Sequence, residues 1–129
     1  MNKILVEVSV GELLDKISIL EIKKLKISDK ESLKFIEKEY VILKEQLDQN
    51  IKSDNKIDEL FKFLKDINLK LWNIEDKKRM CEKNSNFGDE FIKLSREIHF
   101  LNDNRSKIKL EINEYTNSKI REIKMYTNY

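Results

Sequence analysis

The strongest structural signal in the sequence is an apolar stripe that runs through residues 56–83 and again through residues 89–116. In both segments the apolar residues lie three and four positions apart, which places them on one face of an α-helix. Folding the chain at the polar break of residues 84–88 brings the two stripes together in register, so the pattern predicts an antiparallel helical hairpin. The facing pairs are Cys81 with Phe91, Ile74 with Ile98, Leu71 with Leu101, Leu64 with Ile108, and Leu60 with Ile112.

A first hairpin is predicted by the same reasoning over residues 10–50, with one helix that ends near residue 27 and a second that starts directly after it, at the capping signal of residues 28–31, and ends near residue 50. The starts of the predicted helices carry capping signals, in which a Ser or Asp side chain accepts a hydrogen bond from a backbone N–H of the first turn. The expected caps are Ser9, Ser28, and either Ser53 or Asp54.

The predicted fold class is therefore all-α, two antiparallel helical hairpins that form a four-helix bundle or a coiled-coil-like assembly. The sequence has no proline and only two glycines among 129 residues, which favours long helices over a turn-rich β fold. Apolar residues outside the two seams indicate that the hairpins pack on each other, on a second copy, or on both. The single domain divides into an extended arm (1–9), the first hairpin (10–50), a longer second hairpin (56–116) and a tail (118–129).

An alternating pattern at residues 4–10, ILVEVSV, places Ile4, Val6, Val8 and Val10 on one side of an extended chain. This pattern predicts a short N-terminal β arm. A strand needs a partner, and the alternatives are the tail at residues 123–129 or the same arm in a second subunit.

Charge and cysteine content exclude several functions. The net charge is +2, with acids interleaved among the bases, which is not the pattern of a nucleic-acid binder. Cys81 and His99 are the only residues of their types, so we expect no disulfide, no metal site and no cofactor. No run of 18 apolar residues and no signal peptide is evident, so we expect a cytoplasmic protein without a membrane segment.

Three positions in the helical seams are basic instead of apolar, namely Lys24, Lys78 and Arg105. Two have an acid three residues earlier, and the stretch 102–105 is the most polar segment within a seam. One interpretation is a small polar pocket that binds an anion; the other, which we favour, is a set of ion pairs that fixes register or dimerisation. The candidate ligand-binding residues are Glu21, Lys24, Glu75, Lys78, Asp103 and Arg105, and no catalytic residue is predicted.

The stretches 4–23, 71–76 (LWNIED) and 102–105 (NDNR) resemble an uncharacterised family of small helical proteins from marine bacteria and their phages. The resemblance covers nearly the whole chain. It brings no assigned catalytic or binding residues. Relatives lie among genes for cell-surface glycans, which implies an accessory role in glycan synthesis.

Two functions follow as expectations. The first is a non-enzymatic helical module that forms a homodimer and binds a protein partner, because apolar surface is in excess and no catalytic constellation is present. The second is an anion-binding or enzymatic bundle, since the chain weakly resembles the all-helical chorismate mutases, whose pocket is built from Arg, Lys and Glu. Only one arginine lies in a seam, however, whereas those enzymes use several.

Overall fold

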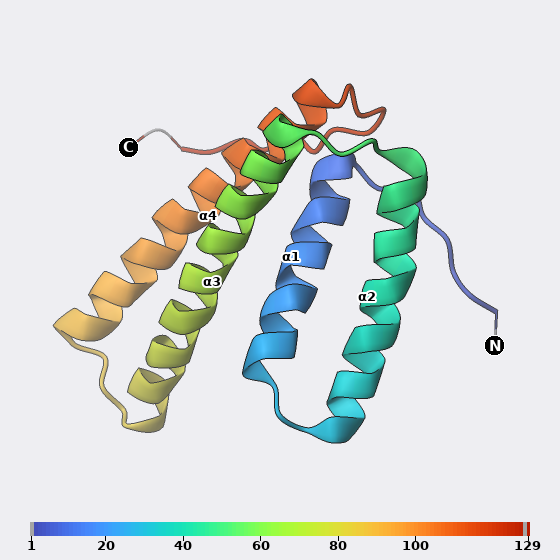
Figure 1. Ribbon diagram of the computed structural model, residues 1–129. Coiled ribbons are helices and arrows are strands. Elements are labelled where there is room, and N and C mark those ends of the chain that lie inside the picture. Colours follow the sequence, from blue (N-terminus) through green and yellow to red (C-terminus); the bar gives the residue numbers. More distant parts are fainter. Residues whose placement is uncertain (1, 128) are drawn as a thin grey trace.

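The computed structural model describes residues 2–127 and 129, which form four helices (Figure 1). The prediction of an all-α fold is confirmed, and within the described residues no strand is present. The helices are α1 (Val10–Lys26), α2 (Lys30–Asn50), α3 (Asn55–Lys83) and α4 (Asp89–Tyr115).

The first helix lies at the centre of the arrangement. It contacts α2, α3 and α4, whereas α2 makes backbone contacts with α1 alone among the described helices. Figure 1 shows α1 and α2 antiparallel on one side and α3 and α4 antiparallel on the other. The molecule is therefore a three-helix unit of α1, α3 and α4, with α2 packed on the outer side of α1.

Side-chain caps define the first three helix starts. The hydroxyl of Ser9 accepts a hydrogen bond from the backbone N–H of Glu12 at 3.0 Å, as predicted. Of the two residues predicted as alternatives for α3, Asp54 is the cap and Ser53 is not. The prediction for α2 is wrong by one residue, because Asp29 and not Ser28 is the cap. The carboxylate of Asp29 accepts both the backbone N–H and the hydroxyl of Ser32, two bonds to one acceptor group.

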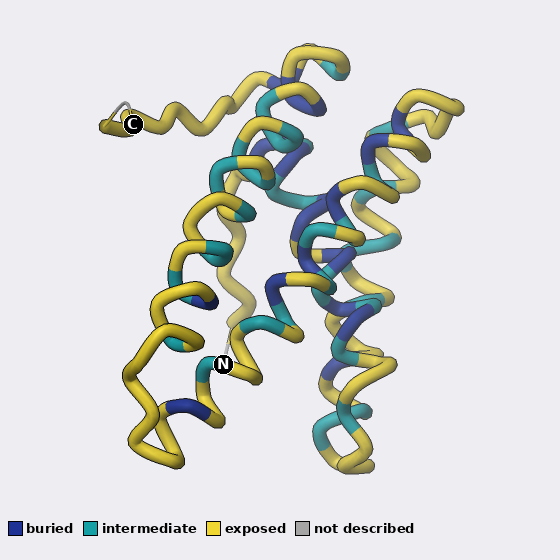
Figure 2. Tube along the Cα trace, turned by 90° about the vertical axis from the view of Figure 1, so that its left-hand side faces the viewer, coloured by how far each residue is buried: buried dark blue, intermediate teal, exposed yellow. Residues whose placement is uncertain are grey.

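The hydrophobic core sits where α1, α3 and α4 meet. Figure 2 shows the buried residues on the inner faces of the helices, with exposed residues along their outer faces. Because α2 touches only one neighbour, it contributes a single buried residue, Ile36. The fully packed core cluster is Leu14, Ile57, Leu60, Leu64 and Ile112.

A second, polar face of α1 is buried as well. Gly11, Asp15, Ser18 and Ile22 lie at helical spacing and are all buried against α3 and α4. At Gly11 the backbones of α1 and α4 come so close that an added Cβ would lie 2.6 Å from the carbonyl oxygen of Lys109. Glycine is required there because no side chain fits between the two helices.

The N-terminal arm, residues 2–8, extends away from the helical body on the side of α2 (Figure 1). The predicted pairing of this arm with the tail is not seen, since neither the arm nor residues 123–127 form a strand. Ile4, Leu5 and Val6 are 90%, 79% and 76% exposed. Met1 and Asn128, which belong to the predicted arm and tail, lie outside the described residues.

No helix in the described part of the chain combines the length and the apolar character needed to cross a bilayer.

Candidate functional site

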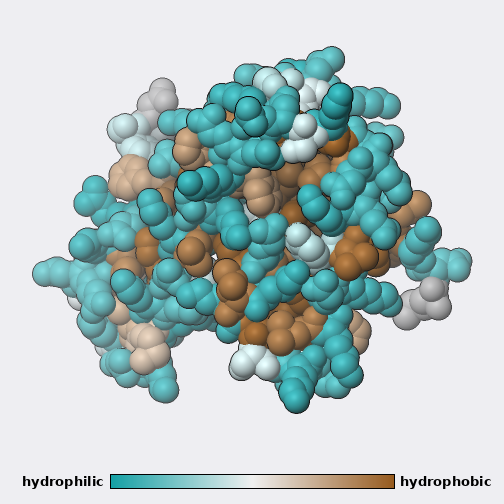
Figure 3. All heavy atoms as spheres, viewed as in Figure 1, coloured by the Kyte–Doolittle hydropathy of each residue, from teal (hydrophilic) through white to brown (hydrophobic). Residues whose placement is uncertain are grey.

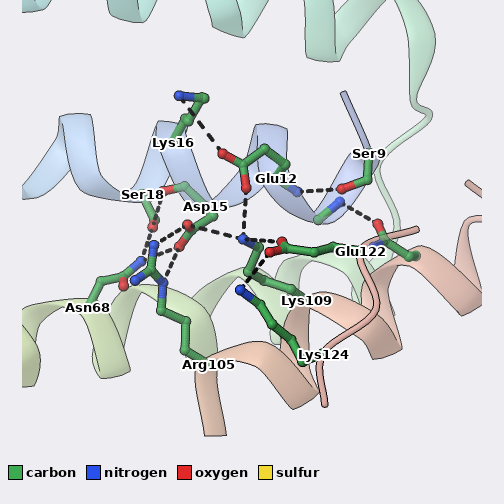
Figure 4. A network of polar contacts seen from close by, with 12 residues as sticks. Ser9, Glu12, Asp15, Lys16, Ser18, Asn68, Arg105, Lys109, Glu122 and Lys124 are labelled. Atoms are coloured by element: carbon green, nitrogen blue, oxygen red, sulfur yellow. Dashed lines mark hydrogen bonds and ion pairs between the residues drawn. The ribbon is translucent and has the colours of Figure 1, made fainter. Parts of the chain in front are cut away.

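A buried carboxylate on α1 holds three helices together. The side chain of Asp15 is 3% exposed and accepts hydrogen bonds from Arg105 on α4 and Asn68 on α3 (Figure 4). Nε of Arg105 lies 3.0 Å from Oδ1 of Asp15 and Nη2 lies 2.5 Å from Oδ2, so the guanidinium binds both oxygens of the carboxylate. The amide of Asn68 donates to Oδ1 at 2.8 Å and to the hydroxyl of Ser18 at 2.7 Å. This bidentate geometry is the strongest form of a carboxylate–guanidinium contact.

Burial by itself raises the pKa of Asp15, but the hydrogen bonds from Arg105 and Asn68 outweigh it and bring the pKa below its usual value. The hydrogen bonds that Arg105 donates to Asp15 likewise raise the pKa of Arg105. Both groups are therefore charged across the physiological range, and each compensates the other.

Lys109 extends this network toward the surface. Its side chain is 13% exposed, and its Nζ lies 2.7 Å from Glu12, 3.4 Å from Glu122 and 3.7 Å from Asp15. Burial lowers the pKa of Lys109, whereas the hydrogen bond that it donates to Glu12 and the charges of the surrounding acids raise it, and the net direction is upward. The three acids compensate the charge of Lys109, which links α1, α4 and the C-terminal segment.

Beside this network lies a polar groove of about 420 Å³ between α1, α4 and the C-terminal segment. The charged residues that line the groove are equal in number, with three acids (Glu12, Asp103, Glu122) and three bases (Arg105, Lys109, Lys124). All three bases already face acids, Lys124 by its ion pair with Glu122 at 2.7 Å, so the groove offers no excess positive potential to a polyanion. The other lining residues are His99, Asn102, Ser106 and Tyr126.

The structure distributes the six predicted site residues over three places. Asp103 and Arg105 line the groove just described, and Asp103 also accepts a hydrogen bond from the hydroxyl of Tyr129. The other four residues lie elsewhere, Glu21 and Lys24 on α1 and Glu75 and Lys78 on α3.

Glu21 and Lys24 lie on α1 but engage different neighbours. Glu21 pairs with Lys65 of α3 at 2.9 Å, and Lys24 pairs with Glu37 of α2 at 3.0 Å. The Nζ of Lys24 also lies 3.9 Å from the ring centroid of Tyr40, a cation–π contact. Both residues therefore bind α1 to its neighbours.

Glu75 and Lys78 share a shallow hollow near the far end of the α3–α4 pair. The Nζ of Lys78 lies 5.1 Å from the ring centroid of Phe91, and no ion pair joins either residue to another described residue. The structure therefore brings neither of them to Arg105.

Asp15, Asn68 and Lys109, the residues that connect the site, are absent from the sequence prediction. The signal for Asp15 is the spacing Gly11, Asp15, Ser18, which places small and polar residues on one face of a helix whose other face is apolar. Such a face is typical of a helix that packs closely against further helices. The partners could not be read from the sequence, because they lie 53 and 90 residues away.

The described residues contain no cluster of His, Cys, Asp or Glu arranged to hold a metal ion.

Comparison with protein families gives one match over residues 4–129, to DUF6165, a family of unknown function. The chain belongs to this family. The family has no described activity, so the match supports a resemblance to uncharacterised proteins and transfers no site. Comparison with curated proteins and with solved structures gives no match.

Proposed function

We propose that this member of the DUF6165 family is a non-enzymatic helical interaction module that acts as a homodimer through its N-terminal arm. The observation that carries the proposal is the exposure of Ile4, Leu5 and Val6, three consecutive large apolar residues that touch little of their own chain. Contiguous exposed apolar surface at a chain end is typical of an association site.

The backbone of the arm supports the same proposal. Residues 2–8 are extended and form no strand with another described segment, so their N–H and C=O groups remain available for pairing. An unpaired extended segment of β-branched residues adds readily to a second strand, in which main-chain hydrogen bonds supply affinity and alternate side chains supply specificity.

The helical body offers further apolar surface for a partner. In Figure 3 the hydrophobic residues gather over the middle of the face on which α1 lies between α2 and α3. Phe35 and Ile42 of α2 are 73% and 50% exposed, because α2 has only one helical neighbour. A cytoplasmic location and an accessory role in glycan synthesis stay predictions from the sequence.

The mass in solution tests the proposal. Sedimentation at micromolar concentration is expected to give twice the mass of one chain for the wild type and the mass of one chain for the double variant Ile4→Ser/Val6→Ser. The matched control is Met80→Ser/Ile92→Ser, which removes two exposed apolar residues from α3 and α4 (52% and 54% exposed) and is expected to leave the dimer intact. A monomeric wild type, or a dimer that survives the loss of Ile4 and Val6, would contradict the proposal.

A second candidate function rests on Arg105. Its Nε and Nη2 are held by Asp15, and no hydrogen bond joins its Nη1 to another described residue, so a fixed guanidinium edge lines the groove. Such an edge binds a small carboxylate or phosphate. Titration calorimetry with citrate and with inorganic phosphate tests this function. Binding that is lost in Lys124→Gln and retained in Lys77→Gln, a change on the distant α3, would support it; equal behaviour of the two variants would reject it.

A further inference from the structure

We infer that two copies of the arm pair as antiparallel β-strands in one defined register, with Leu5 opposite Leu5 of the partner subunit. This inference rests on the proposed arm-mediated dimer and specifies the geometry of its contact. It follows from the position of the two charges within the arm.

The arm carries one base and one acid, Lys3 and Glu7, placed symmetrically about Leu5. In an antiparallel pair centred on Leu5, Lys3 lies opposite Glu7 of the partner subunit, and the two-fold symmetry repeats this contact at the other end. Directly opposite side chains in an antiparallel pair have Cβ atoms about 5 Å apart, close enough for an ion pair. The register therefore satisfies both charges of both arms.

The neighbouring registers leave these charges unmatched. Centring the pair on Val6 puts Glu7 opposite Leu5 of the partner subunit and Lys3 opposite the partner's Ser9. Ser9 is 4% exposed, and its hydroxyl caps α1, so it is not available to a strand. Centring on Ile4 puts Lys3 opposite the partner's Leu5. A parallel pair places like charges opposite each other, which is destabilising.

The same register brings Ile4 and Val6 of both arms together on one side of the ribbon. Side chains alternate along a strand, so Lys3, Leu5 and Glu7 share one side of the ribbon and Ile4 and Val6 share the other. Ile4 then lies opposite Val6 of the partner subunit, and four β-branched side chains form a continuous apolar side. A two-stranded ribbon is marginal by itself, so this side must be covered. The arm leaves the body on the side of α2 (Figure 1), and Val41 and Ile42 of that helix are 45% and 50% exposed.

The free charges of the arm are consistent with this assignment. Lys3 and Glu7 are both exposed, and neither forms an ion pair with another described residue. The cap at Ser9 ends the extended segment at Val8, so the pairing residues 3–7 are followed by a one-residue link to the body. A short link fixes the direction in which each arm leaves its subunit.

A charge-exchange experiment tests the register. Lys3→Glu and Glu7→Lys each place like charges opposite each other at both ends of the ribbon, and each variant alone is expected to dimerise with a Kd about tenfold weaker than that of the wild type. An equimolar mixture of the two variants brings each introduced charge opposite its complement, so the Kd is expected to return to within about threefold of the wild-type value. Lys77→Glu and Glu59→Lys make the same changes of net charge on α3 and are expected to have no effect.

A cross-linking experiment gives a second readout that does not depend on affinity. Leu5→Cys places two thiols directly opposite each other, with Cβ atoms about 5 Å apart against about 4 Å in a disulfide, so a small movement of the strands is expected to let mild oxidation link the subunits. Val6→Cys faces Ile4 of the partner subunit, so it is expected to link poorly by itself and well when mixed with Ile4→Cys.

The outcomes separate the two proposals. If the single charge variants dimerise like the wild type, or if Val6→Cys links faster than Leu5→Cys, the register is wrong while the arm remains the contact. If Ile4→Ser/Val6→Ser leaves the dimer intact, the proposed function itself fails and the register fails with it.

Discussion

Asp15 makes contact with side chains from both other helices of the core. Arg105 and Asn68 satisfy its two oxygens, and Lys109 lies 3.7 Å from Oδ2. A buried ion pair of this kind adds little net stability compared with an apolar pair, but removing one partner leaves an uncompensated charge. We therefore expect the contribution of Asp15 to stability to become visible in a substitution that leaves Arg105 without its counter-charge.

Asp15→Asn is expected to lower the free energy of unfolding by about 3 kcal/mol, because Arg105 stays partly buried without its counter-charge. Urea unfolding monitored by circular dichroism measures the change. Asp66→Asn, at an exposed position of α3, is the control and is expected to change stability by less than about 0.5 kcal/mol. A loss of unfolding free energy no larger than that of the control would show that the network does not stabilise the fold.

The depressed pKa of Asp15 predicts a dependence on pH. The unfolded carboxyl has a pKa of about 3.9 and the folded one lies lower, so the contribution of Asp15 is complete above about pH 4 and is lost as the pH falls through the folded value. The difference in unfolding free energy between the wild type and Asp15→Asn is therefore expected to shrink from pH 7 to pH 3. A difference that stays constant over this range would exclude the charge of Asp15 as its cause.

At the scale of the element, α1 differs from the other three helices because it has three neighbours. Its two buried faces use different chemistry. One is apolar and includes Leu14, whereas the other carries Gly11, Asp15 and Ser18 and makes close backbone and hydrogen-bonded contacts with α3 and α4.

Gly11→Ala is expected to destabilise the protein by about 2 kcal/mol, although alanine is the better helix former, because the new Cβ would clash with backbone of α4. Thermal unfolding measures the effect. Gly88→Ala is the matched control, since its added Cβ would meet nothing closer than 3.6 Å, and little change is expected. A stabilised Gly11→Ala would mean that helix propensity outweighs the contact.

Local patterns of the sequence predicted the elements well. Ser9 and Asp54 were identifiable as caps because a capping bond is made within three residues. Helix faces were predicted less completely. The apolar seams of the sequence pair α1 with α2 alone and include Lys24 as an interruption, whereas the site depends on the opposite face of α1. The amide of Gly11 meets Asn113, 102 residues away, and no local pattern identifies such a pair.

At the scale of the whole molecule, the unequal packing of the helices predicts unequal local stability. α1 buries seven residues, whereas α2 buries only Ile36. Helices with few buried contacts open at lower cost than the global unfolding free energy. We expect α2 to be the least protected of the four helices.

Hydrogen exchange followed by mass spectrometry tests this expectation. Backbone amides of α2 are expected to exchange about tenfold faster than those of the central turns of α1 and α3, after correction for intrinsic rates. The comparison is made in the wild type and in the monomeric Ile4→Ser/Val6→Ser variant, so that protection by dimer contacts is separated from protection by the fold. Equal protection in the monomer would show that α2 unfolds only together with the three-helix unit.

The central position of α1 also has a consequence for synthesis on the ribosome. This helix leaves the exit tunnel before α2, α3 and α4, but Asp15 and Gly11 on its polar face must wait for Arg105 and Asn113, which emerge 90 and 102 residues later. Until then a nascent chain can form the contacts of α1 with α2 and α3, with Asp15 bonded to Asn68 but without its counter-charge, and the side of α1 that faces α4 stays uncovered. Assembly of the core is thus tied to completion of the last helix, and a chain that stalls before residue 105 has no means of closing it.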